Sequence, residues 1–345
     1  MSYISSDYVQ CETIQQMLDD NFKVCPAVEE MPALEAILAG QAEAKITQEV
    51  SNGDGKVKNV KLVYEPRLLE SAVTQQSGTR GCTTTNETFD NYTNYTIDPS
   101  VWLEASEKFE TENLNTVCTT DVQGMIARKL EKIIDVLDRK TATKTASELV
   151  ALYGKWASNV AGVTSDELVV RTLINPTTKQ LDDTALVDIK LALKQTGYCG
   201  NKVIVGGSTL YKFGERINAG CCATTGVNLL DAARQFGVAF AYDDRIATAI
   251  GSEDKSIVFQ PGSVAMLKYN TAPQVPNLGA NYAKFRIASP RTGIWYDITM
   301  KDDCGVIHII GRVTTKLVAL PTDMYDVGDK FRGVNFINKI KVDNA

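Results

Sequence analysis

Residues 119–140, which read TTDVQGMIARKLEKIIDVLDRK, restrict the possible folds of this chain more than any other segment. Large apolar side chains recur there at spacings of three and four residues, which places them on one face of an α-helix. Thr120 and Gln123 match a capping box at the start of that helix. The apolar positions are Val122, Met125, Ile126, Leu130, Ile133, Ile134 and Leu137. The pattern predicts a long helix that covers a hydrophobic core.

A second amphipathic pattern follows and extends the helical region to residue 160. Thr145 and Glu148 form another possible capping box. The apolar positions of this pattern are Leu149, Val150, Tyr153, Trp156, Ala157 and Val160. The two patterns together predict one bent helix or two helices in series. Their total length indicates a spine rather than a compact lobe.

The residues before this spine predict an extended arm and then β-structure. In residues 1–44, Pro26 and Pro32 break short helical pieces, and Gly40 is expected to end the first turns of the helix in MPALEAILAGQAEAKI. Residues 45–67 predict two strands around the turn-forming sequence NGDG. Residues 74–98 are rich in threonine and aromatic side chains, so they predict strand and turn rather than disorder.

Three N-x-[ST] sequons lie in that last segment, at Asn86, Asn91 and Asn94. A sequon matters only when a chain meets the secretory glycosylation machinery. The first twenty residues lack a basic stretch followed by an apolar one, so no secretory signal is expected. The eight cysteines contain no C-x-x-C pair, which favours reduced thiols. We therefore interpret the sequons as coincidental.

Beyond the spine, residues 165–270 alternate short helices and strands and predict a compact α/β domain. Its first helix, in DDTALVDIKLALKQTG, has Asp182 or Asp183 as a cap and Gly197 as its stop. The segments that follow are the strand NKVIVGG, the helices STLYKFGERINAG and GVNLLDAARQFG, and the strands in VAFAY and KSIVFQPGSVAMLKYN. Residues 280–340 predict two or three long antiparallel strands, with turns near Pro290 and at DD, residues 302–303. The fold class is α+β.

The residues contain little catalytic chemistry. VIVGGSTL lacks the third glycine of a dinucleotide motif and the G-K-[ST] ending of a P-loop, so a strand-to-helix turn with Ser208 as N-cap explains it without a ligand. Adjacent acids, as in DD at 182–183, 243–244 and 302–303, point to opposite faces of a strand and favour caps or turns. His308 is the single histidine and lies in a strand pattern. We therefore expect no catalytic residue, no cofactor and no metal.

The order of these parts resembles the Hong Kong 97 (HK97) phage-type major capsid protein, a family of tailed-phage shells and encapsulins. The likeness is strongest across residues 182–300. LDDTALVDIKLALKQTGYCGNKVIVGGSTLYKF is similar to the family's helix, Gly-Tyr break and strand. AARQFGVAFAYDDRI and IVFQPGSVAMLKYN are similar to the strands that follow, and RTGIWYDITMKDDC to the return strand of the peripheral domain. The resemblance implies an HK97-like capsid fold.

The resemblance also implies a division of the chain. It assigns residues 1–44 to an N-terminal arm, 45–98 to a β-hairpin called the E-loop, 99–164 to a peripheral domain with the spine helix, 165–270 to an α/β axial domain, and 271–345 to the peripheral return strands and C-terminus. In the family the E-loop reaches across a neighbouring subunit. Phe89, Tyr92 and Tyr95 are therefore candidate inter-subunit contacts.

The implied function is structural rather than enzymatic. Such a subunit assembles as hexamers and pentamers into an icosahedral phage head that encloses double-stranded DNA. Its implied partners are copies of itself, a portal, a separate scaffolding protein and possible decoration proteins, with no membrane. The net charge of −6 suggests that DNA is contacted weakly and without sequence preference. The implied location is the virion, after assembly in the host bacterial cytoplasm.

Two alternatives remain open from the sequence. An encapsulin-type shell would share the fold but enclose a cargo enzyme. An α/β enzyme that uses a nucleotide at the VIVGGSTL turn would belong to another class and would form a small oligomer.

Overall fold

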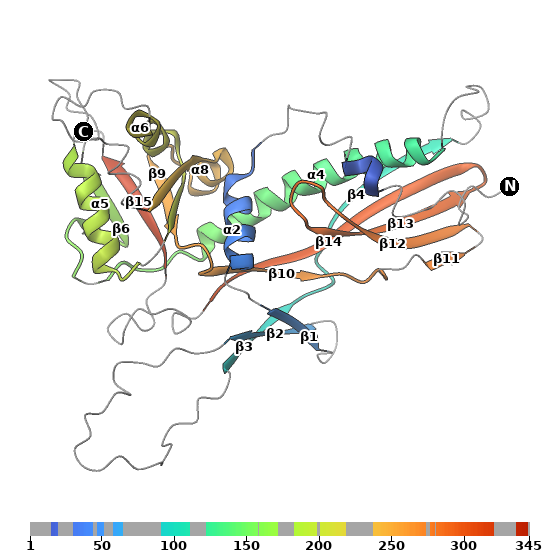
Figure 1. Ribbon diagram of the computed structural model, residues 1–345, viewed down its shortest axis with the longest axis horizontal. Helices are drawn as coiled ribbons and strands as arrows, with labels where there is room; N and C mark the ends of the chain where they lie inside the picture. Colours follow the sequence, from blue (N-terminus) through green and yellow to red (C-terminus); the bar gives the residue numbers. More distant parts are fainter. Residues whose placement is uncertain are drawn as a thin grey trace, which may run out of the picture.

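The computed structural model describes residues 15–19, 30–43, 47–51, 58–64, 91–110, 122–157, 159–171, 183–198, 201–218, 237–273, 277–279, 281–320 and 336–343. Within these ranges the chain is α+β and forms three sheets (Figure 1). A long helix and a long antiparallel sheet form one body, a mixed sheet with short helices lies at one end of it, and a small sheet projects from its middle. No helix in the described ranges has the length and apolar character needed to cross a membrane.

The long helix expected from the apolar stripe is confirmed as α4 (Val122–Ala151). Its stripe is buried, with Ile126, Leu130 and Ile134 fully covered. The helix ends at residue 151, so the predicted continuation to residue 160 is wrong. Trp156 and Val160 instead pack in the core of the mixed sheet. The second capping box is also wrong, because residues 145 and 148 lie inside the helix.

Helix α4 lies along a six-stranded sheet with the order β10–β14–β13–β12–β11, in which β4 also pairs with β14. Every one of these pairs is antiparallel, which confirms the long antiparallel strands expected near the C-terminus. The β13–β14 turn is formed by Cys304 and Gly305, both with positive φ, and Asp302 accepts a hydrogen bond from the Gly305 N–H. The strands are β4 (Leu103–Glu110), β10 (Val264–Tyr269), β11 (Asn277–Gly279), β12 (Tyr282–Ala288), β13 (Trp295–Asp303) and β14 (Val306–Ala319).

Gly311 of β14 allows α4 to lie directly on the sheet. A Cβ atom at this position would lie 2.5 Å from Cγ2 of Ile133 and 3.0 Å from Cδ1 of Leu137. A glycine in a strand commonly marks such a close approach. Alternate β14 residues on the same face, including Ile309 and Val313, belong to the same buried cluster. Helix and sheet therefore share one continuous core.

The mixed sheet has the order β5–β6–β15–β9–β7–β8 and confirms the expected α/β character. Gly197 follows α5 with φ of 87°, as expected for a helix stop. Tyr198 comes next, is buried, and donates a 2.7 Å hydrogen bond to Oδ1 of Asn338 on β15. The strands are β5 (Val163–Thr164), β6 (Glu167–Arg171), β7 (Lys202–Gly206), β8 (Val238–Tyr242), β9 (Lys255–Phe259) and β15 (Ile337–Asp343). The helices are α5 (Asp183–Gln195), α6 (Ser208–Asn218) and α8 (Asp244–Ile250).

Towards its C-terminal end the chain passes back and forth between the two large sheets. Strand β9 belongs to the mixed sheet, but β10, which follows it through Pro261 and Gly262, belongs to the long sheet. Strand β15 then returns to the mixed sheet, between β6 and β9. A boundary at residue 270 would therefore group β10 with the mixed sheet and β15 with the long sheet, whereas each strand pairs in the other sheet. The helix expected in GVNLLDAARQFG lies outside the described residues.

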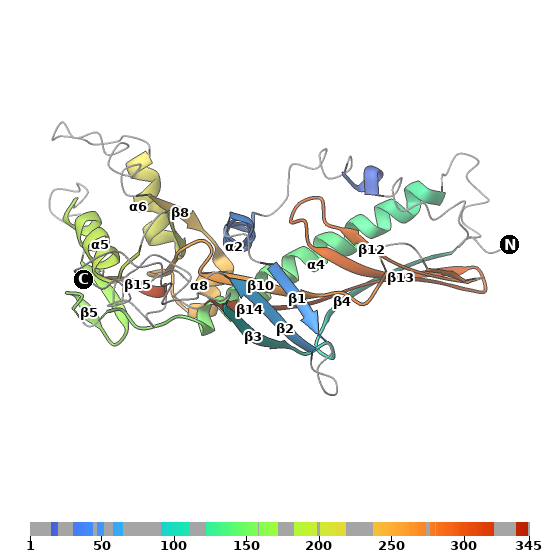
Figure 2. The same cartoon turned by 60° about the horizontal axis from the view of Figure 1, so that its bottom comes forward.

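The small sheet, named here the β-arm, consists of β1 (Thr47–Ser51), β2 (Lys58–Tyr64) and β3 (Asn91–Ile97) in that order. It confirms the strands expected in this region, while the NGDG turn lies outside the described residues. Figure 2 shows the β-arm on the side of the long sheet opposite α2 and α4. Ile97 packs there in a small core with residues of β10 and β14.

Helix α2 (Pro32–Glu43) corrects two expectations about the N-terminal region. Pro32 begins the helix instead of breaking one, because the missing N–H of a proline is not needed in the first turn. The helix also continues through Gly40. A Cβ atom at Gly40 would lie 2.5 Å from the backbone nitrogen of Gly262, so this glycine permits close packing rather than ending the helix.

Candidate assembly surfaces and internal polar clusters

The glycine turn of VIVGGSTL joins β7 to α6, and the polar groups at the start of α6 bond to residues of the chain itself. The Ser208 N–H donates to Oε2 of Glu253 at 2.8 Å, and Oγ1 of Thr209 donates to Oδ1 of Asp254 at 2.9 Å. Ser208 is the first residue of α6 and not its N-cap, so that prediction is wrong. Anions bind helix N-termini through such N–H groups. Here the Glu253 carboxylate already occupies that place, which argues against a phosphate.

Gly207 is expected to be essential to this turn. A Cβ atom there would lie 1.9 Å from the carbonyl oxygen of Glu253, a backbone atom that cannot rotate away. Substituting Gly207→Ala should lower the free energy of unfolding by about 2–3 kcal/mol, as overpacking does. Chemical denaturation measures this. Gly251→Ala is the control, because no atom lies within 4 Å of its Cβ position and only its positive φ opposes alanine. Equal costs for both variants would contradict the clash.

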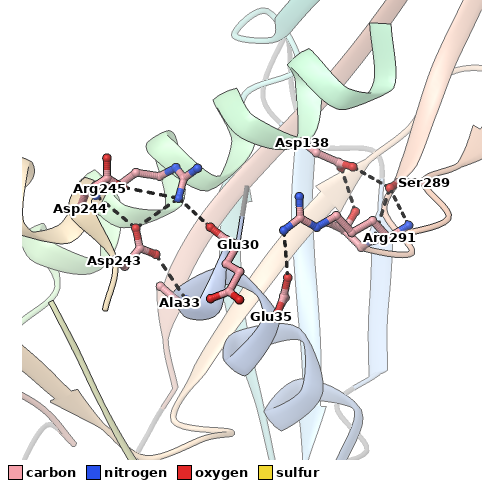
Figure 3. Close-up of polar contacts among 10 residues, drawn as sticks. Glu30, Ala33, Glu35, Asp138, Asp243, Asp244, Arg245, Ser289 and Arg291 are labelled. Carbon is pink, nitrogen blue, oxygen red and sulfur yellow. Dashed lines mark hydrogen bonds and ion pairs between the residues drawn. The ribbon is translucent and has the colours of Figure 1, made fainter. Parts of the chain in front are cut away.

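The acid pair Asp243–Asp244 confirms the cap interpretation. Asp243 is the N-cap of α8 and accepts a 3.1 Å hydrogen bond from the Arg245 N–H. Its other oxygen accepts from the Ala33 N–H of α2 at 3.4 Å (Figure 3). Burial raises the pKa of Asp243, and the Arg245 guanidinium, 3.3 Å away, opposes that rise. The carboxylate thus links two helices and is not available to a substrate.

Asp138 of α4 is the most buried acid of the described chain segments. Its carboxylate accepts hydrogen bonds from Oγ of Ser289 at 2.7 Å, from Oγ1 of Thr292 at 2.9 Å, and from the hydroxyl of Tyr296. All three donors belong to β13 or to the loop between β12 and β13. Burial raises the pKa of Asp138 in spite of these three bonds. The cluster fastens that loop to the helix, and its burial keeps it from any substrate.

The raised pKa of Asp138 predicts a pH-dependent contribution to stability. An acid whose pKa is higher in the folded state contributes fully below its unfolded pKa, and the contribution is lost as pH rises through the folded pKa. Lowering the pH from 7 towards 4 should therefore stabilise the natural protein relative to Asp138→Asn, which cannot titrate. Paired denaturation curves across this range give the difference. A difference that does not change with pH would show that the buried carboxyl ionises normally.

The remaining acids, cysteines and histidine of the described residues do not assemble a reactive site. No group of three or more His, Cys, Asp or Glu side chains in these ranges could hold a metal ion. His308 lies half-buried on β14, opposite Lys301 of β13 and Lys108 of β4. Neither of these two cross-strand neighbours is a carboxylate that could orient the imidazole as a general base. Cys304 is a free, exposed thiol at a hairpin turn.

The three candidate inter-subunit contacts have different places. Phe89 lies outside the described residues. Tyr92 lies on β3 opposite Val63 of β2. Tyr95, also on β3, is half-buried, and its hydroxyl donates a 2.7 Å hydrogen bond to the carbonyl oxygen of Ala319 on β14. Tyr95 therefore holds the β-arm to the long sheet of its own subunit, and contact with a neighbour remains a prediction for all three.

Sequence reasoning missed an exposed cluster where β3 leads into β4. Val101 and Trp102 are 58% and 45% exposed. The Arg312 guanidinium lies 5.5 Å from the ring centre of Trp102 and donates a 2.6 Å hydrogen bond to Glu104, which lowers the pKa of that acid. The available signal was a pair of large apolar residues directly after the turn sequence DPS. Tryptophan and arginine dominate binding energy in protein interfaces, so this cluster is a candidate assembly surface.

The comparisons with known proteins give structural matches only. No protein-family model and no curated protein matches the chain. A chain from Mycobacterium phage Bobi is 11% identical, with 94% of each chain covered and a TM-score of 0.43. A chain from the capsid of Myoviridae phage XM1 is 12% identical over 87% of this chain and 90% of that chain, with a TM-score of 0.41. A virus-like particle from Pyrococcus furiosus is 13% identical over 92% and 100%, with a TM-score of 0.39.

Structures from cyanophage P-SCSP1u and bacteriophage PhiM1 are also similar, and like that of phage XM1 they are described as capsids. Since these TM-scores lie below 0.5, the function of the chain has to be inferred from its own residues.

Proposed function

We propose that this chain is the structural subunit of a closed icosahedral shell. The observation that carries the proposal is the β-arm, which projects from the long sheet on the side away from α4 (Figure 2). Among the described strands, β1 pairs with β2 alone, so its outer edge has no partner there. Such an edge is a liability in a monomer because it pairs with other chains. In a symmetric assembly the same edge becomes an interface.

The shell in this proposal is a phage head made of hexamers and pentamers that encloses double-stranded DNA. The order of parts supports it, and in this proposal the β-arm is the E-loop of the family that the sequence resembles and α4 is its spine helix. The net charge of −6 suits a shell that encloses DNA without binding it tightly. A portal, a separate scaffolding protein and decoration proteins would be further partners, and assembly would occur in the host bacterial cytoplasm.

The internal polar clusters favour a structural role over the enzyme alternative. Glu253 occupies the helix N-terminus that a nucleotide phosphate would need. Asp138 and Asp243 are buried and bonded to backbone or hydroxyl groups of the same chain. These acids bond one element of the chain to another and so stabilise the fold, as the structural subunit of a shell requires.

Electron microscopy of the expressed protein tests the proposal. We expect closed shells of uniform diameter, either from the chain alone or when it is coexpressed with a scaffolding protein. Discrete small oligomers under both conditions would contradict it. Nuclease-protected DNA inside shells isolated from infected cells would separate a phage head from an encapsulin-type shell, which would contain an enzyme instead.

A further inference from the structure

Helix α2 lies where the long-sheet body meets the mixed-sheet body. It packs against α4 and β10 of the first and against β7 and β8 of the second. Met31, Leu34 and Ile37 are fully or almost fully buried in the core that these elements share. Its residues precede both bodies in the sequence and belong to neither sheet.

The N-terminal end of α2 is tied to the mixed-sheet body. The Ala33 N–H donates to Asp243, and Nη1 of Arg245 donates a 3.1 Å hydrogen bond to the carbonyl oxygen of Glu30. Both partners stand at the start of α8, as Figure 3 shows. The Ala33 N–H belongs to the first turn, whose N–H groups have no partner within the helix itself, and Glu30 lies two residues before the helix.

The rest of α2 is tied to the long-sheet body. Glu35 pairs with Arg291 at 3.5 Å, and Arg291 lies on the loop that Asp138 fastens to α4 (Figure 3). The side-chain amide of Gln41 accepts from the Met266 N–H at 3.1 Å and donates to the Met266 carbonyl oxygen at 3.5 Å. Gln41 thus bonds to β10 as a neighbouring strand would.

Between these two sets of ties, α2 touches one of the three places where the chain crosses from one body to the other. Pro261 and Gly262 connect β9 of the mixed sheet to β10 of the long sheet. Gly262 has φ of 86°, a left-handed conformation that favours glycine. The Cβ position of Gly40 lies 2.5 Å from the Gly262 nitrogen and 2.7 Å from Cβ of Pro261, so the helix is seated directly on this turn.

We propose that α2 is a strut that locks the hinge at Pro261–Gly262 and thereby fixes the angle between the two bodies. Because α2 belongs to neither sheet, it can detach without breaking a strand pair in either one. When α2 is displaced, the bodies stay joined by the packing of α8 on α4 and by the chain connections, and the angle between them changes within those limits. For a shell, this would let identical chains fit five-fold and six-fold positions, a consequence that rests on the proposed function. The proposal that α2 fixes the angle between the two bodies does not rest on the proposed function.

Gly40→Ala in the full chain tests the lock in the unassembled subunit. The added methyl group meets backbone atoms of the turn and should unseat α2, although alanine favours a helix over glycine. We expect small-angle scattering to show an altered subunit shape. We also expect hydrogen exchange in residues 32–43 and 260–263 to rise at least tenfold, while β13, β14, β9 and β15 keep their protection. Ala39→Gln, one residue away on the exposed side, is the matched control and should behave as the natural protein.

Two outcomes would overturn the proposal. An unchanged scattering profile with fast exchange in α2 would show that the helix does not set the angle. Joint loss of protection in both sheets would show that α2 is an inseparable part of one core. If Gly40→Ala does not fold, Gln41→Leu decides, because it removes both bonds to Met266 and should give the same changes at smaller amplitude. These measurements need no shells, so their failure is distinct from a failure to assemble.

Discussion

Replacing Ile133 by aspartate should leave no soluble, folded protein. Ile133 lies in the middle of α4, is 2% exposed, and meets β14 at Gly311, where no side chain separates helix and strand. A carboxylate at this position would be buried without a partner and would also remove the packing of the isoleucine. Together these effects should cost about 4 kcal/mol or more. That is a large share of the roughly 5–15 kcal/mol that stabilises a typical protein.

Val136→Asp is the matched control for this substitution. Val136 lies on the same helix but is 40% exposed, so the same change in charge should alter the free energy of unfolding by no more than about 1 kcal/mol. Soluble yield, circular dichroism and denaturation curves of both variants decide the matter. A folded, assembling Ile133→Asp protein would show that this stripe is not the core of the subunit.

Deleting residues 52–96 should give a soluble, folded body that forms no closed shells. The deletion removes β2 and most of β3 but keeps Ile97, which packs with β10 and β14. None of the described residues of the deleted segment (58–64 and 91–96) belongs to the core between α4 and the long sheet, so cooperative unfolding should persist. Loss of the projecting β-arm should eliminate a subunit contact that is repeated across the whole shell. Electron microscopy and light scattering measure the outcome.

Tyr95→Phe distinguishes the loss of the β-arm from a looser attachment. It keeps the aromatic ring and removes the hydroxyl that donates to the Ala319 carbonyl oxygen, a change of about 1 kcal/mol. Shells should still form from this variant. Normal shells from the deletion itself would refute the assignment of the β-arm as an inter-subunit element.

The period of the apolar residues was enough to predict α4, because a stripe that faces one sheet leaves a regular pattern. The end of the helix was not predictable by the same means. The stripe continues in the sequence to Trp156 and Val160, yet these residues are buried in a different core. Periodicity reports that a side chain is buried and does not report against which element.

Glycines and caps show the same limit at single residues. Gly40 looked like a helix stop and Ser208 like an N-cap from local propensity. Distant residues decide both positions, since Gly40 packs on Pro261 and Gly262, and Glu253 accepts the hydrogen bond of the Ser208 N–H. The exposed cluster around Trp102 depends on the register of β4 with β14, which brings Arg312 opposite Glu104. Such long-range pairings leave no local pattern in a sequence.

The position of β15 has a consequence for the timing of folding. Lys339 pairs with Glu167 on one side and with Ile257 on the other, so residues from far apart in the chain must meet to complete the mixed sheet. Such non-local pairing forms slowly, because closing a long loop costs conformational entropy before any stabilising contact is made. During translation, β6 and β9 each keep one unpaired edge until residues 337–343 have left the ribosome. A complete mixed sheet therefore forms only after residues 337–343 have been synthesised and have inserted between these two edges.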